Sequence, residues 1–346
     1  MRYSVKDFHI KIPEELIAQY PYKERGDSRL LVFDLRNNTL KDDYFRNISN
    51  YISSNECIIY NDAKVINARI FGVKNETGAR IEILLTRKFN ELEWYAIVRP
   101  ARRVRTGTLI NVSKGHELEV TGEMGEGLFK VRFSKPVEYK DLENIGEIPL
   151  PKYIKRKPVK EIDGQRYQTI FSRKYGAVAS PTAGLHFTDR TVNEIKQKGA
   201  VFIPVTLHVD WGTFKPVREQ DYRDHKIHKE MYEISGESAR RIKKCVEEGR
   251  RILCVGTTSI RTIETAVDKN GNIRSRKGET SLYIYPGYRF KLIDGMITNF
   301  HMPDSTLILL VAAFCGKDGI KRAYNHAISQ KYRFFSYGDA MLILKR

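Results

Sequence analysis

Apolar and polar positions along this chain follow two different patterns, and the pattern changes twice. Between about Val65 and Phe133 every second residue of several short segments is apolar, and glycine-containing turns separate a number of them. The segments are 67–71, 79–85, 93–98, 108–112, 117–120 and 127–133. Short strands at close and even spacing are typical of a small antiparallel barrel or sandwich. We therefore predict a small β-barrel domain inserted into a larger unit.

Longer apolar runs and amphipathic segments lie on both sides of this insertion and predict mixed α/β structure. We expect helices over residues 13–19, 238–248 and 307–315 and another that begins at Thr258 or Ser259; strands over 29–34, 57–60, 251–255 and 340–344; and a hairpin of 281–285 with 288–293. The predicted fold is an α/β (mixed α+β) main domain, residues 1–62 and 147–346, with helices around a largely parallel or mixed sheet. Residues 63–146 form the inserted antiparallel β-barrel domain.

Residues 176–209 predict a β-α-β unit. A strand over 176–179 leads to a helix with Thr188 as N-cap and Gly199 as C-cap, and a second strand follows over 201–209. The loop 180–186 then lies at the carboxyl end of a strand, which is where ligands bind in open α/β sheets. The alternative interpretation is a tight connector with an incidental histidine.

Four predicted loops share this position and a similar composition. They are residues 180–186, 208–214, 256–261 and 299–303, and each combines small hydroxyl or glycine residues with one histidine or arginine. If the preceding strands are parallel neighbours, all four loops open on one edge of the sheet. Such a composition suits a polar organic ligand better than a metal. His186, His208 and His301 could transfer protons near neutral pH, although each could equally be a structural histidine with satisfied hydrogen bonds.

Other chemical signals are weak. His225 and His228 would share a face of a helix as half of a metal site, but no further ligands stand out, so we predict no metal. The chain has no Walker sequence, and the glycine-rich turn of Rossmann-type methyltransferases is missing. Four widely spaced cysteines predict buried thiols in a reducing cytosol, and the first residues show no signal-peptide pattern. We expect a cytoplasmic protein that does not bind membranes.

The charge of the chain favours a polyanionic partner. Lysine and arginine number 60 against 42 acidic residues, which gives a formal charge of +18 and favours nucleic acid; the alternative is a lysine-rich solvated surface. Two basic segments could neutralise the phosphates of a nucleic acid. Their residues are Arg99, Arg102, Arg103 and Arg105 in the first and Lys155 and Arg156 in the second. The aromatic run 332–337 could stack a base or pack in the core.

With these residues assembled, the chain resembles the S-adenosylmethionine:tRNA ribosyltransferase-isomerases of the queuosine pathway over nearly its whole length. The matching segments are 16–19, 28–30, 61–72, 146–151, 166–169, 179–188, 206–209, 212–214, 255–262, 284–287, 297–301 and 332–341. One departure lies beside the expected site: Asp210, followed by Trp211, stands where the family usually has glycine.

This resemblance implies a reaction. The ribosyl part of S-adenosylmethionine is transferred to a 7-aminomethyl-7-deazaguanine at the tRNA wobble position and isomerised to an epoxycyclopentanediol, which gives epoxyqueuosine and releases adenine and methionine. The donor is consumed as a substrate, and no metal or redox cofactor is required, because the sulfonium activates the sugar. The implied fold is an α/β domain carrying a β-barrel, and we expect a monomer.

The same resemblance suggests residue roles. His186 or His208 would act as the general acid or base, while Asp62, Arg261 and Asn299 would orient the ribose, the carboxylate or the base. The small residues Thr182, Gly184, Gly212 and Thr213 allow a ligand to approach closely. The other expected substrate-binding residues are Lys64, Arg69, Ser180, Ala183, Thr257, Thr258, His301, Arg333 and Ser336.

Two rival functions remain open from the sequence. A non-catalytic RNA-binding protein would explain the charge and the barrel, but it would not need four polar loops at strand ends. A methyltransferase would use the same donor but would release S-adenosylhomocysteine rather than adenine and methionine.

Overall fold

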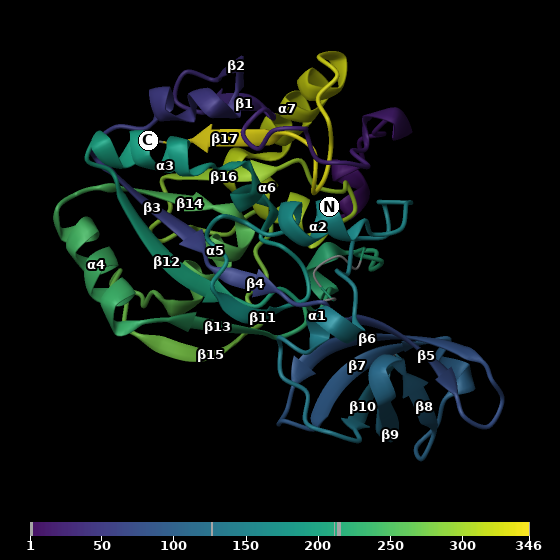
Figure 1. Cartoon of the computed structure of the whole chain (residues 1–346). Coiled ribbons are helices and arrows are strands. Elements are labelled where there is room, and N and C mark those ends of the chain that lie inside the picture. The colour runs from purple at the N-terminus through teal and green to yellow at the C-terminus, as the bar shows by residue number, and fades with distance from the viewer. Residues whose placement is uncertain (1–2, 126, 211, 213–215, 346) are drawn as a thin grey trace.

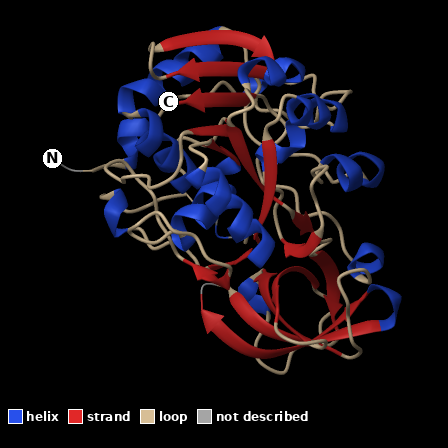
Figure 2. Cartoon of the chain, turned by 90° about the vertical axis from the view of Figure 1, so that its left-hand side faces the viewer, coloured by secondary structure: helices blue, strands red, loops and turns tan. Residues whose placement is uncertain are grey.

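The structure is a computed structural model and describes residues 3–125, 127–210, 212 and 216–345. In this part of the chain a nine-stranded mixed sheet is flanked by helices, and a closed six-stranded barrel is attached at one end (Figures 1 and 2). The predicted fold class, an α/β main domain with a small antiparallel barrel, is confirmed.

The large sheet has the strand order β15-β13-β12-β3-β14-β16-β17-β1-β2. Its strands are β1 (Arg29–Asp34), β2 (Thr39–Tyr44), β3 (Glu56–Asn61), β12 (Val201–Leu207), β13 (Glu230–Ile234), β14 (Arg251–Val255), β15 (Arg276–Thr280), β16 (Gly295–Asn299) and β17 (Ala340–Leu344). β12, β3, β14 and β16 are consecutive parallel neighbours, whereas β13, β15, β17 and β2 supply the antiparallel pairs.

Apolar side chains on both faces fix the sheet at the centre of the molecule. Every residue of β3 is buried; Cys57 and Ile59 pack into one core cluster, and Ile58 and Tyr60 into another on the opposite face. This is the pattern expected of a parallel strand covered on both sides. The helices are α1 (Leu142–Ile145), α2 (Lys160–Arg166), α3 (Asp189–Gln197), α4 (Gly236–Glu247), α5 (Gly256–Ala266), α6 (Thr306–Cys315) and α7 (Lys317–Ser329).

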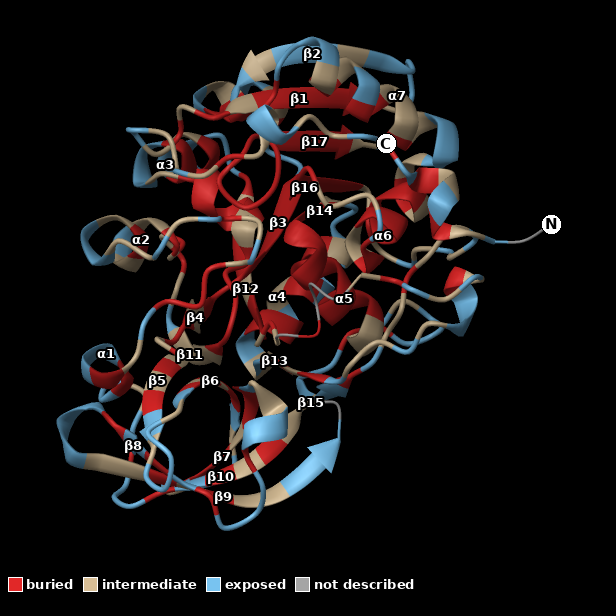
Figure 3. Cartoon of the chain, turned by 90° about the vertical axis from the view of Figure 1, so that its right-hand side faces the viewer, coloured by how far each residue is buried: buried red, intermediate tan, exposed pale blue. Residues whose placement is uncertain are grey.

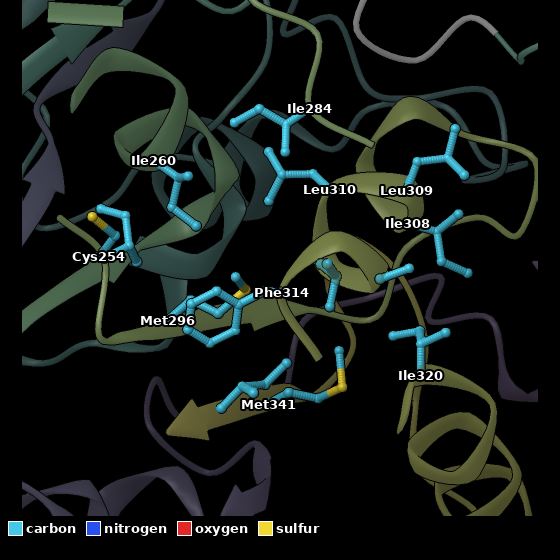
Figure 4. Packing of buried hydrophobic residues seen from close by; sticks show 14 of the residues in the cluster. Cys254, Ile260, Ile284, Met296, Ile308, Leu309, Leu310, Phe314, Ile320 and Met341 are labelled. Atoms are coloured by element: carbon cyan, nitrogen blue, oxygen red, sulfur yellow. The ribbon is translucent and has the colours of Figure 1, made fainter. Parts of the chain in front are cut away.

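Helices α5 and α6 belong to the larger of these clusters. Figure 4 shows Ile260 of α5 and Leu310 of α6 close to Ile284, with Met296 of β16 below them. Of the four free cysteines three are buried as predicted, but Cys315, the last residue of α6, is only half-buried, because the helix ends there near the surface. Within the described residues, the helices are all too short or too polar to cross a bilayer.

The predicted β-α-β unit is wrong in one respect. The strand before α3, β11 (Lys174–Ala177), is not a neighbour of β12 but pairs with β4 (Ala63–Val65) in a separate two-stranded sheet. Gly176 adopts a φ of 133° and the register shifts beside it, so β11 ends early. The Val178 amide nevertheless donates to the Val209 carbonyl at 2.9 Å, which brings the loop after β11 next to the loop after β12.

Two other predicted elements differ. Residues 281–293 form no hairpin; Ile284 and Ile293 are instead buried in the larger core cluster, and β15 just before them pairs with β13. The helix expected over 13–19 is a single 3-10 turn, Glu14–Leu16, because Ile17 forms a bridge with Phe334.

The barrel closes in the order β10-β7-β6-β5-β8-β9. Its strands are β5 (Arg69–Lys74), β6 (Arg80–Lys88), β7 (Glu93–Arg99), β8 (Leu109–Val112), β9 (His116–Gly125) and β10 (Leu128–Phe133). Inward residues such as Ile83, Val98 and Val131 are buried, and Figure 3 shows this buried interior below the main sheet. The Arg87–Glu279 ion pair at 2.7 Å joins the barrel to β15 of the main sheet, and Tyr139, just after the barrel, stacks on Tyr175 of β11.

Candidate active site

A recess of about 610 Å³, counting space open to solvent, lies where the loops after β11, β14 and β16 meet. We call it the central recess. Parts of all four predicted loops contribute, since Val209 represents the loop after β12. The described residues that line it are Tyr153, Ser180, Pro181, Thr182, Ala183, Val209, Gly256, Thr257, Thr258, Thr298, Asn299, Phe300, His301, Met302, Ser305, Leu307, Phe335 and Ser336.

The lining of the central recess combines apolar side chains with uncharged polar groups. Among the described lining residues none is Asp, Glu, Lys or Arg. Three buried oxygens, Ser180 Oγ, Thr258 Oγ1 and Asn299 Oδ1, have no hydrogen-bond partner in the described part of the protein. Because buried polar atoms are normally satisfied, such atoms at a recess are available to bind a polar ligand.

The recess also receives the N-terminus of α5. Gly256, with a φ of 83°, turns the chain from β14 directly into the helix, which therefore begins two or three residues earlier than predicted. No side chain caps this end, and Gly256, Thr257 and Thr258 line the recess. The uncapped N–H groups and the positive end of the helix dipole favour an anionic group such as a carboxylate.

His301 lies in the lining and is held in a fixed orientation. Its Nε2 is 2.7 Å from Thr298 Oγ1, and its backbone N–H donates to the Tyr324 hydroxyl at 2.6 Å. Burial lowers the pKa of His301 to about 3, so the ring is neutral at physiological pH.

His186 borders the central recess without lining it. Its Nδ1 is 2.7 Å from Ser28 Oγ, its ring lies 5.1 Å from that of Phe45, and Nε2 has no hydrogen-bond partner in the described residues. Burial lowers the pKa of His186 to about 4, an effect that the nearby Asn299 amide opposes and the charge of Arg25 reinforces. The ring is therefore neutral, with Nδ1 held by Ser28 and the opposite side of the ring beside Asn299 of the central recess.

A second depression, of about 320 Å³, adjoins the first, and we call it the side recess. Its lining residues are Pro21, Tyr22, Glu24, Arg25, Gly26, Ser28, Arg166, Leu185, His186, Ser336, Tyr337 and Gly338. Ser336 lines both recesses, and His186 lies between Ser28 of the side recess and Asn299 of the central recess.

Asp62, His208 and Lys64 lie outside both linings, in a polar cluster around β11. Asp62 accepts a hydrogen bond from Thr206 at 2.6 Å, and burial raises its pKa, partly offset by that bond. The His208 ring packs against Gly176; Nδ1 has no partner in the described part of the chain, and burial lowers its pKa. Lys64 donates to the Tyr175 hydroxyl at 2.8 Å. The structure thus separates these three from His186 and His301.

Arg261 is likewise outside the linings and has a buried partner that sequence reasoning missed. It forms an ion pair with Glu230 of β13, both side chains being at most 3% exposed, and its Nε donates to the Leu282 carbonyl at 3.1 Å. Glu230 also accepts the Asp210 amide at 3.0 Å. The pair therefore joins α5 to the loop that carries the unusual Asp210.

The remaining predicted substrate-binding residues are accounted for as follows. Arg69 pairs with Glu82 on the barrel at 2.9 Å, and Arg333 donates to the Tyr20 carbonyl and lies over the Tyr22 ring. Gly184 and Gly212 are outside the linings, but a Cβ at either would lie within 2.9 Å of a neighbouring side chain. Thr213 and Trp211 lie outside the described residues.

Sequence reasoning missed several lining residues. Tyr153 and Phe335 meet at 4.8 Å between ring centres, and the Tyr153 hydroxyl is 2.5 Å from Ser336 Oγ. Burial raises the pKa of Tyr153 to about 12, so it stays protonated. The aromatic run 332–337 is the sequence signal for Phe335, whereas no pattern in the sequence marks Tyr153 as a site residue.

The basic segments behave differently from one another. Arg99, Arg102, Arg103 and Arg105, at the end of β7 and in the turn Ala101–Arg103, are exposed and form no ion pair among the described residues. By contrast Lys155 pairs with Glu14, and Arg156 makes two 2.7 Å bonds to the buried Asp163. Of the six predicted tRNA-binding side chains, the four arginines of the first segment are the ones without an ion pair among the described residues.

The idea of a helical His225–His228 face is wrong, because residues 225–229 are not helical and His225 Nδ1 lies 2.8 Å from Glu219. In the part of the chain that the structure describes, no group of three or more His, Cys, Asp or Glu side chains could hold a metal ion.

The two buried histidines make stability depend on pH. In the unfolded chain they titrate near 6.5, whereas the folded pKa values are about 4 for His186 and about 3 for His301. Between these values the unfolded state binds more protons, so we expect the free energy of unfolding to fall as pH drops from 6.5 towards 4.5, by up to about 1.4 kcal/mol per pH unit for each histidine. Urea unfolding at pH 7 and pH 5 measures this, with His301→Asn as the variant.

That variant should show a shallower dependence on pH, whereas His9→Asn, which replaces an exposed histidine, should match wild type. An equal slope in wild type and His301→Asn would contradict the burial argument.

Comparisons with known proteins identify the family to which this chain is similar. The chain matches the family described as queuosine biosynthesis protein over residues 5–343. It is 45% identical to the S-adenosylmethionine:tRNA ribosyltransferase-isomerase of Caldanaerobacter subterraneus, covering 98% of this chain and 99% of that protein. It is 44% identical to the Clostridioides difficile protein of the same name, with the same coverage.

A solved structure agrees with these matches. The crystal structure of S-adenosylmethionine tRNA ribosyltransferase from Thermotoga maritima is similar with a TM-score of 0.56 at 34% identity, covering 98% of this chain and all of that one.

Proposed function

The chain belongs to the queuosine biosynthesis protein family, and from this premise we propose that it transfers the ribosyl part of S-adenosylmethionine to tRNA and isomerises it. The acceptor is a 7-aminomethyl-7-deazaguanine at the wobble position, the product is epoxyqueuosine, and adenine and methionine leave. The observation that carries the proposal is the central recess, which has unpartnered polar atoms but no charged side chain among its described lining residues.

The donor fits this lining by its charges. S-adenosylmethionine carries a carboxylate, which suits the uncapped N-terminus of α5 beside Thr257 and Thr258. Its sulfonium is a cation, and the faces of Phe335 and Tyr153 offer an attractive surface without an opposing positive charge. Ser180 Oγ and Asn299 Oδ1 remain for ribose or base hydroxyl and amino groups.

Proton transfer is the chemistry that the protein supplies. The sulfonium acidifies the C5′ hydrogens, so a modest base is sufficient, and methionine leaves as a neutral thioether. We assign the proton transfer to His186 rather than His208, because His186 is neutral, lines the side recess and lies beside Asn299 of the central recess, whereas His208 lies outside both. Since the sulfonium supplies the activation, the proposed reaction uses no metal or redox cofactor.

The tRNA is the proposed partner of the barrel arginines. Replacing Arg102 and Arg103 together with alanine should raise KM for tRNA about 10-fold at physiological salt and lower the slope of log affinity against log salt by about 2, because each guanidinium neutralises a phosphate. KM for S-adenosylmethionine should stay unchanged.

Filter binding and steady-state kinetics measure both effects. The charge-matched control is Lys243→Ala with Lys244→Ala on α4, where both lysines are exposed. Equal tRNA affinity for the two double variants would remove the barrel from the proposed interface.

Incubation with S-adenosylmethionine and tRNA bearing the deazaguanine tests the function itself. Mass analysis of the nucleosides should show epoxyqueuosine, with one adenine and one methionine for each. S-adenosylhomocysteine would indicate a methyltransferase, and tRNA binding without any product would indicate an RNA-binding protein. We further propose that the enzyme is cytoplasmic and monomeric. Size-exclusion chromatography with light scattering tests whether it is a monomer in solution.

A further inference from the structure

We propose that the side recess holds the acceptor base of the tRNA and that the Glu24 carboxylate binds the hydrogen-bond donors on its edge. The inference rests on the proposed function, since it names the place of the second substrate. Three observations carry it: the position of the side recess, the state of its charged groups, and the glycines and the Tyr22 ring in its lining.

The position follows from the shared wall. Ser336 lines both recesses, and the His186 ring contacts Ser28 on one side and lies beside Asn299 on the other. A transfer between two bound substrates requires their reacting atoms to be held in contact range. With the donor in the central recess, the adjoining depression is where an acceptor would meet it.

The charged side chains of the side recess differ in whether they already have hydrogen-bond partners within the protein. Arg25 donates to the Leu185 and Gln168 carbonyls at 3.0 and 2.9 Å, and Arg166 donates to the Lys23 carbonyl at 2.8 Å. Both guanidinium groups thus support the backbone. Glu24 is exposed and has neither a hydrogen bond nor an ion pair in the part of the chain that the structure describes. Its carboxylate is the acceptor group left for a ligand.

The chemistry of the acceptor matches such a group. A deazaguanine presents N1–H and the exocyclic 2-amino group side by side, and a carboxylate can accept both hydrogens at once. Bases in single-stranded loops are read on this edge, and an anticodon loop offers such a base.

Two glycines and the Tyr22 ring line part of the side recess. Gly26 and Gly338 contribute no side chains to it, and the backbone at Gly338 requires glycine, because a Cβ there would lie 2.4 Å from the Arg333 carbonyl oxygen. At the rim the Tyr22 ring is fixed by its hydroxyl, which donates to Asp339 at 3.0 Å, and by the Arg333 guanidinium 4.3 Å from its centre. A rigid aromatic ring beside two residues without side chains suits a planar base.

The first test is kinetic and uses Glu24→Gln and Glu24→Ala in the full-length enzyme. We expect kcat/KM for deazaguanine-bearing tRNA to fall about 10- to 100-fold, as for loss of one bidentate base contact, while KM for S-adenosylmethionine stays within about twofold. Glu15→Gln is the matched control, because Glu15 is an exposed glutamate outside both linings.

The second test needs no turnover. Wild type should bind tRNA with guanine at the wobble position more tightly than tRNA with hypoxanthine, which lacks the 2-amino group, and Glu24→Ala should bind both equally. Unchanged kinetics together with an unchanged preference in Glu24→Ala would overturn the inference while leaving the proposed function intact. If wild type makes no product at all, the proposed function fails, and the binding preference still decides the role of Glu24.

Discussion

Replacing His186 with alanine is expected to slow adenine release by about 100- to 10,000-fold, the range for losing a positioned acid–base group. The physical reason is that the neutral His186 ring is buried next to the recess assigned to the donor, held by Ser28 on one side and beside Asn299 of that recess on the other. Adenine release from S-adenosylmethionine with saturating tRNA measures the effect. KM for the donor should change little, because the ring borders the central recess without lining it.

Two comparisons separate catalysis from folding. His9→Ala removes an exposed histidine and should retain wild-type turnover. Ser28→Ala removes the hydrogen bond to Nδ1 while keeping the ring, so it should slow turnover less than His186→Ala. Near wild-type turnover of His186→Ala, in protein with an unchanged urea midpoint, would remove His186 from the mechanism.

Glu230→Ala should be the most destabilising single change, costing about 3–5 kcal/mol of unfolding free energy. It leaves the Arg261 guanidinium buried without its counter-ion and also removes the acceptor of the Asp210 amide. Domains are stable by only about 5–15 kcal/mol, so the variant should unfold at markedly lower urea concentration. Because the pair joins α5 to the loop after β12, the remaining folded protein should also bind the donor more weakly.

Glu279→Ala provides the control for this change. Glu279 pairs with Arg87 at the surface, where both side chains are at least one-third exposed, so its loss should cost no more than about 1 kcal/mol. A Glu230→Leu, Arg261→Leu double variant should recover much of the stability, since no unpaired charge stays buried. Equal losses for Glu230→Ala and Glu279→Ala would contradict the view that burial makes this pair critical.

The sequence predicted those parts of the fold that depend on local periodicity. Alternating apolar residues identified the barrel strands, and apolar runs identified β1, β3, β14 and β17. The helix after Thr188 was foreseen because its capping box is local, and Thr188 does accept the Thr191 amide. Local periodicity does not predict how distant segments pair. β11 pairs with β4 rather than with β12, and the tyrosine-rich segment 281–293 packs on the core instead of forming a hairpin.

The same distinction holds for the site. The loops after β12, β14 and β16 do meet, because these strands are parallel and their direction places the loops on one edge; the loop after β11 joins them through the Val178–Val209 hydrogen bond. The predicted residues that line the central recess are Ser180, Thr182, Ala183, Thr257, Thr258, Asn299, His301 and Ser336. Sequence alone could not reveal that Glu230 neutralises Arg261, that Asp163 engages Arg156, or that Asp62 and His208 form a separate cluster. Each of these depends on a tertiary contact that no local pattern encodes.

The most direct test is a crystal structure of His186→Ala with S-adenosylmethionine and an anticodon stem-loop bearing the deazaguanine, since this variant should bind both substrates without turnover. The proposal predicts the sulfonium in the central recess near Phe335, the donor carboxylate at the N-terminus of α5, and the base in the side recess within hydrogen-bond distance of Glu24. Binding of the donor at the polar cluster of Asp62 and His208, or anywhere else outside the central recess, would contradict it.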